Sequence, residues 1–164
     1  MMKKLFIVLL ACWLSACGYH LRGTEQAAVK FKKVYLEGAT EALREQFDEV
    51  LKLSSARLAK SAKEADLHIK VDDEKYNRRV VSLNFSGRSN QLELSYRLKF
   101  QLTGADNAPL PSNEPLLITR EFFNDQQDIL AKNNEEGVIR REMYRQAVRS
   151  ILDRAKAQIQ AKAK

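Results

Sequence analysis

The fold class of this 164-residue chain is decided by one segment, Leu92-Glu93-Leu94-Ser95-Tyr96-Arg97-Leu98-Lys99-Phe100-Gln101-Leu102-Thr103. Apolar and polar residues alternate through all six pairs of this segment. Side chains of a β-strand point alternately to opposite faces of a sheet. The alternation therefore predicts a long strand with one face on a core and the other face in water.

Further strand signals surround this segment. Shorter strands are predicted at 34–36, at 67–71 with a resumed alternation at 81–85 after a charged break, and at 116–123. Ser86-Gly87 and the stretch 104–107 supply turn residues on either side of the long strand. Strands joined by short turns pair antiparallel, so the sheet is expected to be mainly antiparallel.

Two segments have the spacing of amphipathic helices. Thr40 can cap a helix in which six residues repeat at helical spacing: Leu43, Phe47, Val50, Leu51, Ser54 and Leu58. Asn124 or Asp125 can cap a second, longer helix with an apolar side formed by Val138, Ile139, Met143, Ala147, Ile151 and Ala155. The order β-α-β-β-β-α predicts an α+β fold, a four-stranded mainly antiparallel sheet packed against two helices.

The first sixteen residues have the form of an export signal. Lys3 and Lys4 precede the apolar run Leu5–Leu14, and Ser15 and Ala16 follow it. Ten helical residues span about 15 Å, half of the hydrocarbon core of a bilayer, so this run is too short for a permanent membrane span. Residues 1–16 are therefore predicted to be a signal peptide that is removed.

The end of the signal resembles a bacterial lipobox. Leu14-Ser15-Ala16-Cys17 matches the motif in which the signal is cut before the cysteine and the new N-terminus is acylated. An ordinary secretory signal is the alternative, but it would leave Cys17 as a lone exported thiol. Two or more acyl chains anchor a protein stably, and Gly18 in place of Asp resembles the outer-membrane sorting signal of Gram-negative lipoproteins. Covalent acyl chains on Cys17 are the only cofactor expected.

The mature chain is predicted to hold one domain. The expected boundaries are 17–33 for a lipidated tether, 34–160 for a single α+β domain and 161–164 for a frayed tail. The whole chain has 28 basic and 21 acidic residues, and removal of Lys3 and Lys4 leaves 26 against 21, a net charge of +5. A basic surplus favours an acidic partner, and export puts nucleic acid out of reach. An anionic membrane surface or an anionic ligand remains.

The sequence contains no pattern typical of catalysis. The only histidines are His20 and His68, and no serine or cysteine triad, zinc-protease motif, phosphate-binding loop or metal-ligand spacing is present. The acidic run 72–74 could suggest a cation site, but basic neighbours make a solvated strand end the better interpretation. We therefore expect no enzyme activity and no metal.

Basic residues provide the candidate binding site. Arg78, Arg79 and Arg88 flank the apolar stretch 81–85 near a predicted turn. Clustered guanidinium groups can bind phosphates bidentately, although a solvated surface is the alternative. A second basic series, Arg141, Arg145 and Arg149, is better explained as a solvated helix face because acidic residues partly offset it.

Phe122 and Phe123 are candidates for partner contact. Adjacent residues of a strand face opposite sides, so one of the two rings is expected to be exposed unless a partner covers it. An aromatic pair divided between the core and helix packing is the alternative.

Three stretches carry a resemblance to a known family. They are Cys17-Gly18-Tyr19-His20-Leu21-Arg22-Gly23, Arg120-Glu121-Phe122-Phe123-Asn124-Asp125, and Leu130-Ala131-Lys132-Asn133-Asn134-Glu135 followed by Glu142-Met143-Tyr144. With these stretches in order behind a lipobox, the chain resembles the outer-membrane lipopolysaccharide-assembly lipoproteins of the LptE family. The resemblance covers nearly the whole mature chain.

The resemblance implies a function as well as a fold. Members of the family are lipid-anchored at the periplasmic side of the outer membrane, plug the lumen of the β-barrel LptD in a 1:1 complex, and bind lipopolysaccharide that the pair inserts into the outer leaflet. Carried over by motif, the lipopolysaccharide-binding residues are Lys132 and Arg88, with Arg78 or Arg79 as alternatives because the register around Arg88 is open. A stand-alone envelope lipoprotein that binds an anionic glycolipid or glycan without a barrel partner is the competing hypothesis.

Overall fold

The computed structural model describes residues 31–111, 114–123 and 129–162, and for 129–133 it describes the backbone. The predictions for the signal peptide, for Cys17 and the motif after it, and for a helix cap at Asn124 or Asp125 lie outside these residues.

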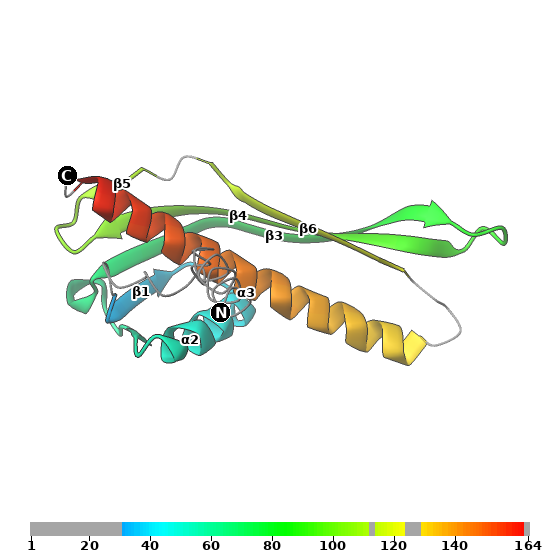
Figure 1. Ribbon diagram of the computed structural model, residues 1–164, viewed down its shortest axis with the longest axis horizontal. Helices are drawn as coiled ribbons and strands as arrows, with labels where there is room; N and C mark the ends of the chain where they lie inside the picture. Colours follow the sequence, from blue (N-terminus) through cyan, green and yellow to red (C-terminus); the bar gives the residue numbers. More distant parts are fainter. Residues whose placement is uncertain (1–30, 112–113, 124–128, 163–164) are drawn as a thin grey trace, which may run out of the picture.

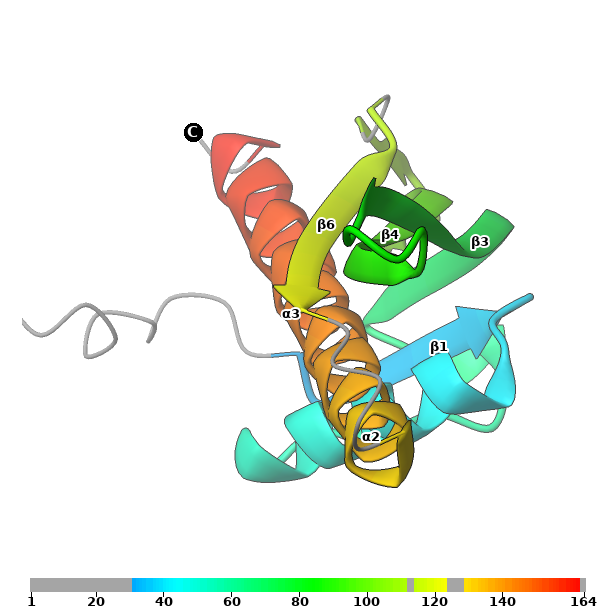
Figure 2. The same ribbon diagram turned by 90° about the vertical axis from the view of Figure 1, so that its right-hand side faces the viewer.

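The described residues form one sheet with two long helices on one face (Figures 1 and 2). The elements in chain order are β1 (Lys33–Glu37), α2 (Glu41–Leu53), β2 (Arg57–Leu58), a short 3₁₀ helix η1 (Ala62–Glu64), β3 (Leu67–Leu83), β4 (Ser89–Gly104), β5 (Pro109–Leu110), β6 (Leu116–Phe123) and α3 (Ile129–Lys162). Neighbouring strands are β2-β1-β3-β4-β5, and β6 also pairs with β4. The pairs β1–β2 and β1–β3 are parallel, and the pairs that involve β4 are antiparallel.

The predicted α+β class is confirmed, and the strand count needs a correction. The long elements follow the predicted order β-α-β-β-β-α, and β6 has the predicted bounds. The sheet has six strands and not four, because β2 and β5 add two residues each at its margins. Two residues are too few for an alternating pattern, which explains why no sequence signal indicated these strands.

The first helix begins as predicted and ends earlier. Thr40 caps α2, and its Oγ1 accepts a hydrogen bond from the Leu43 backbone N–H at 3.4 Å. The helix ends at Leu53, and Ser55 has a left-handed φ of 56°, which stops helix propagation. Leu58, predicted on the apolar side of this helix, lies in β2 instead.

The core lies between the helix-facing side of the sheet and the two helices. Every second residue of β4 from Leu92 to Leu102 is buried, as the alternation predicts, and Tyr96 is fully buried. Phe47 of α2 and Met143, Ala147 and Ile151 of α3 are also buried, and truncation of Phe47, Met143 or Ile151 to alanine typically costs about 2–5 kcal/mol. Val138, predicted on the apolar side of the long helix, is 55% exposed.

Both predicted domain boundaries shift slightly. Phe31 is only 8% exposed and belongs to the core, and Lys33 opens β1, so the domain includes residues assigned to the tether. At the other end α3 continues to Lys162, where the side-chain amine is 2.5 Å from Asp106 Oδ2. The tail that was expected to fray from residue 161 is therefore helical for two more residues.

β3 and β4 extend much further than their neighbours. β1 pairs with β3 only up to Lys70, and β6 pairs with β4 only over residues 91–98. Figure 1 shows the two central strands running on past the ends of β6 and α3. On that side the molecule therefore ends in the β3–β4 ribbon, which β6 accompanies as a third strand up to Gln91.

Candidate ligand-binding site at the distal hairpin

The end of this ribbon, residues 80–91, is here called the distal hairpin. The alternation at 81–85 predicts a strand, and β3 does continue to Leu83. None of the three apolar side chains of this alternation is buried, however: the exposed fractions are 45% for Val81, 63% for Leu83 and 114% for Phe85. The sequence pattern thus predicted a strand here but ended it two residues late, since Phe85 lies in the turn, and the predicted charged break is wrong because β3 runs unbroken from Leu67 to Leu83. It also gave no indication that the apolar side chains lie outside the core.

A hydrogen-bonded turn orders the tip of the hairpin. The Asn84 backbone N–H donates to the Arg88 carbonyl at 2.8 Å, and the Gly87 N–H donates to the Asn84 carbonyl at 2.9 Å. Asn84 Oδ1 accepts from the N–H groups of Ser86 and Arg88, each at 3.0 Å. Gly87 has a φ of 73°, a left-handed conformation that glycine adopts at little cost. The turn therefore presents Phe85 and Arg88 in a defined arrangement.

Arg88 is the only charged residue in the stretch 80–92. It is exposed, and its backbone N–H is used within the turn. Within the described part of the chain, its guanidinium group has no hydrogen bond or ion pair. Arg88 is therefore available to an external anion.

Arg78 lies on the ribbon nearer to the centre of the sheet, and it binds a carboxylate of α3. Its Nε is 3.0 Å from Glu136 Oε2, and the Tyr76 hydroxyl donates to the other oxygen of that carboxylate at 3.1 Å. Burial and the negative charge of Glu136 raise the pKa of Tyr76 to about 12, and the Arg140 guanidinium lies 5.6 Å from the Tyr76 ring centre. These contacts bind the base of the ribbon to the N-terminal half of α3.

Arg79 lies on the opposite face and is paired across the β3–β4 ribbon. Its Nε and Nη2 donate to the two carboxylate oxygens of Glu93 at 2.6 and 2.9 Å. This bidentate pair lowers the pKa of Glu93 and raises that of Arg79. The structure thus distinguishes three arginines that the sequence treats alike, because Arg78 and Arg79 have partners in this chain.

Lys132 lies in the first turns of α3, where the structure describes the backbone alone. The start of α3 is at the same end of the molecule as the distal hairpin (Figure 1). The backbone arrangement therefore brings the predicted residues Arg88 and Lys132 to one end of the domain.

Phe122 and Phe123 have different environments. Phe122 is 7% exposed and packs in the core, so it is removed as a candidate for partner contact. Phe123 is 66% exposed on the other face of β6, where it pairs in register with Gln91 at the base of the distal hairpin. Partner contact stays a prediction for Phe123 alone.

Sequence reasoning missed the contribution of Tyr76 and Glu136. They are 60 residues apart, and no local pattern links them. It also missed the exposed apolar tip. A signal for the tip was present, since 80–92 is a 13-residue stretch with one charge in a chain that is 30% charged.

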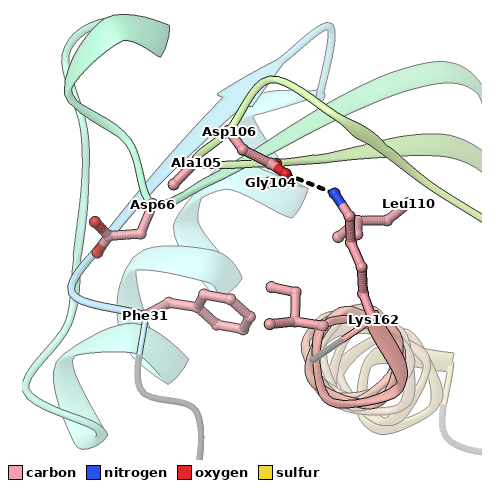
Figure 3. A pocket seen from close by; sticks show the side chains of 8 residues that line it. Phe31, Asp66, Gly104, Ala105, Asp106, Leu110 and Lys162 are labelled. Carbon is pink, nitrogen blue, oxygen red and sulfur yellow. Dashed lines mark hydrogen bonds and ion pairs between the residues drawn. The ribbon is translucent and has the colours of Figure 1, made fainter. Parts of the chain in front are cut away.

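A separate cavity of about 330 Å³ lies at the far end of the sheet (Figure 3). Phe31, Leu110 and Ile159 provide apolar walls, and the Lys162–Asp106 pair closes one side. Asp66 also lines the cavity, but its Oδ2 accepts hydrogen bonds from the backbone N–H groups of Lys32 and Lys33. Because both carboxylates are engaged by this chain, the cavity offers little to orient a ligand.

The described ranges contain neither a membrane-spanning helix nor a clustered metal site. None of their helices has the length and the apolar composition needed to cross a membrane. In the same ranges, no group of three or more His, Cys, Asp or Glu residues is arranged as a metal site.

Solved structures with this architecture include two lipoproteins. The solution structure of lipoprotein B from Nitrosomonas europaea superposes with a TM-score of 0.66 at 28% identity, covering 89% of this chain and 94% of that one. The crystal structure of the rare lipoprotein B from Shewanella oneidensis gives a TM-score of 0.62 at 22% identity, with 80% and 98% covered, and shows the shared fold. The class of protein is thus an α+β domain, a sheet with two helices on one face, of the type found in bacterial lipoproteins.

Sequence comparison specifies the family. The profile of the family described as "LptE: Lipopolysaccharide-assembly" matches residues 31–155, so the chain belongs to the LptE family. The protein named LPS-assembly lipoprotein LptE of Pectobacterium atrosepticum is 29% identical over 147 residues, covering 84% of this chain and 76% of the relative. The protein of the same name from Photorhabdus laumondii is 26% identical over 140 residues, with the same coverages. The family resemblance stated from the motifs is confirmed.

Proposed function

We propose that this protein is an outer-membrane lipoprotein, anchored by acyl chains on Cys17, that plugs and assembles an LptD-like β-barrel and binds lipopolysaccharide for insertion into the outer leaflet. Family membership supports the assignment to lipopolysaccharide assembly, since relatives carry that function in their names. Docking and binding, not chemical conversion, are the proposed roles.

One observation carries the binding part of the proposal: Arg88, the only charge of 80–92, is exposed at an ordered turn without a partner in the described part of the chain. The phosphates of lipopolysaccharide are suitable ligands for a guanidinium group, which can donate two hydrogen bonds to one phosphate. Lys132, at the same end of the domain, is the proposed second cation. Arg78 and Arg79 are less suitable because each already binds a carboxylate of this chain.

The ligand experiment compares charge reversals at matched sites. Arg88→Glu is expected to weaken lipopolysaccharide binding by about tenfold or more, and Arg57→Glu, an exposed arginine on the marginal strand β2, is the control. Binding is measured at moderate and at high salt, because screening weakens contacts between exposed charges. Equal weakening by both variants would show a general charge effect and would remove Arg88 as a binding residue.

The partner experiment is a pull-down of the acylated protein from its native membrane. We expect a large outer-membrane barrel to be recovered in a 1:1 ratio, with Arg88→Glu recovering as much barrel as the wild type. Recovery of the acylated protein without any barrel, together with full lipopolysaccharide binding by a Cys17-truncated chain, would instead support a stand-alone glycolipid-binding lipoprotein.

A further inference from the structure

The distal hairpin exposes apolar side chains where charges usually protect a strand. Exposed edge strands commonly carry charged side chains that prevent association. The lower part of β3 follows this rule, with Lys75, Arg78 and Arg79. Beyond Arg79, toward the tip, β3 carries no further charged side chain. The apolar side chains there are exposed, with fractions of 51% for Val80, 45% for Val81, 63% for Leu83 and 114% for Phe85.

These side chains do not belong to the core of this chain. Val80, Leu92 and Phe122 form one row across β3, β4 and β6, and the last two are buried at 1% and 7%. Val80, in the same row, is half exposed because it lies on the outer strand of the ribbon. Leu83 and Phe85 lie beyond the last β4–β6 pair, where β6 has ended (Figure 1).

The polar groups of the tip limit what it can recognise. Asn84 uses its side-chain oxygen within the turn, and the other polar side chains of 80–92, apart from Arg88, are neutral hydroxyls and amides. The group of exposed apolar side chains and the single cation distinguish the tip from the charged part of β3. An arginine can keep its charged end in a polar layer while its own stem and its neighbours lie in an apolar one. Acyl chains beside a phosphate match this arrangement in both apolarity and charge.

We infer that the distal hairpin binds the lipid end of lipopolysaccharide, with Leu83 and Phe85 among the acyl chains and Arg88 at a phosphate. The inference rests on the proposed function and deepens it, because it names the acyl chains and not the sugars as the part of the ligand that the apolar tip contacts. The affinity then has an apolar component that salt does not screen.

A tryptophan at the tip can report the environment directly. The chain has one tryptophan, Trp13, which lies in the predicted signal peptide. Phe85→Trp in the mature chain carrying Cys17→Ala, which needs no detergent, is expected to shift its emission to shorter wavelength on addition of lipopolysaccharide. The matched control is Leu117→Trp, at a residue that is 64% exposed on β6 but distant from the tip.

Three results would overturn the inference. The first is an equal shift with lipopolysaccharide from which the acyl chains have been removed. The second is an equal shift at position 117. The third is an equal shift with phosphatidylglycerol vesicles, which would assign the tip to any anionic membrane and not to lipopolysaccharide.

A second variant separates the inference from the proposed function. Leu83→Ser combined with Phe85→Ser retains Arg88 and changes only exposed side chains, so the fold is expected to survive. Loss of both apolar contacts should weaken lipopolysaccharide binding by about a hundredfold, with barrel recovery unchanged. If this double variant binds like the wild type while Arg88→Glu binds weakly, the acyl-chain contact is wrong and the proposed function stands.

Discussion

Gly38→Ala should destabilise the fold far more than an ordinary surface substitution. Gly38 lies between β1 and α2 with a φ of 74°, and a Cβ added there would be 2.6 Å from the Val71 carbonyl oxygen. The left-handed conformation costs an alanine about 1–2 kcal/mol. Displacement of a strand carbonyl adds strain of about 1–3 kcal/mol, so we expect a loss of about 2–5 kcal/mol in the free energy of unfolding.

Gly87→Ala provides the matched control. Gly87 has nearly the same φ, 73°, but nothing lies within 4 Å of an added Cβ. It should therefore show only the conformational part, about 1–2 kcal/mol. Urea unfolding followed by far-ultraviolet circular dichroism measures both variants, and an unchanged m-value would show that only stability changed. Equal losses in the two variants would refute the argument that the approach to Val71 requires a glycine at position 38.

Three other predictions concern the base of the ribbon and β6. Glu74→Ala should cost about 1–3 kcal/mol in urea unfolding, because Glu74 accepts hydrogen bonds from the buried Tyr96 hydroxyl and from the Thr40 N–H and hydroxyl, and an unchanged midpoint would contradict this. Because the folded-state pKa of Tyr76 is raised to about 12, its contribution to stability is present below pH 10 and is lost as the pH rises from 10 toward 12. Melting temperatures across this range should fall less steeply for Tyr76→Phe, and equal slopes would count against the shift. Phe122→Ala should cost about 3–5 kcal/mol, and Phe123→Ala about 0.5 kcal/mol or less with reduced barrel recovery; similar melting temperatures for the two would contradict the observed burial.

The parts of the fold that the sequence predicts best are those with long periodic patterns. β4 shows clear alternation from Leu92 to Thr103, and the structure contains this strand. The end of α2 was placed too late because Leu58 continues the helical spacing by chance after the chain has turned at Ser55. Periodicity indicates on which face of a helix or strand a residue would lie, but it does not show where that helix or strand ends.

The candidate site was less accessible from sequence because it depends on distant pairings. The Arg79–Glu93 pair follows from the hairpin register once the turn at Gly87 is known. The partner of Arg78 is Glu136 on α3, which only tertiary packing reveals. Sequence reasoning could therefore name a group of three arginines but could not show that Arg88 differs from the other two.

Unequal strand lengths explain how a stable domain can carry an exposed apolar tip. β3 and β4 have 17 and 16 residues, whereas β1 has five and β6 has eight, so the central pair must leave the sheet as a ribbon. A two-stranded hairpin is marginally stable by itself in water. The contacts of Tyr76 and Arg78 with Glu136 join the base of the ribbon to α3, the helix that also holds Lys132. Glu136 therefore binds β3 shortly before the distal hairpin and lies about one helical turn after Lys132 on α3, so one carboxylate links the two elements that carry the proposed cations.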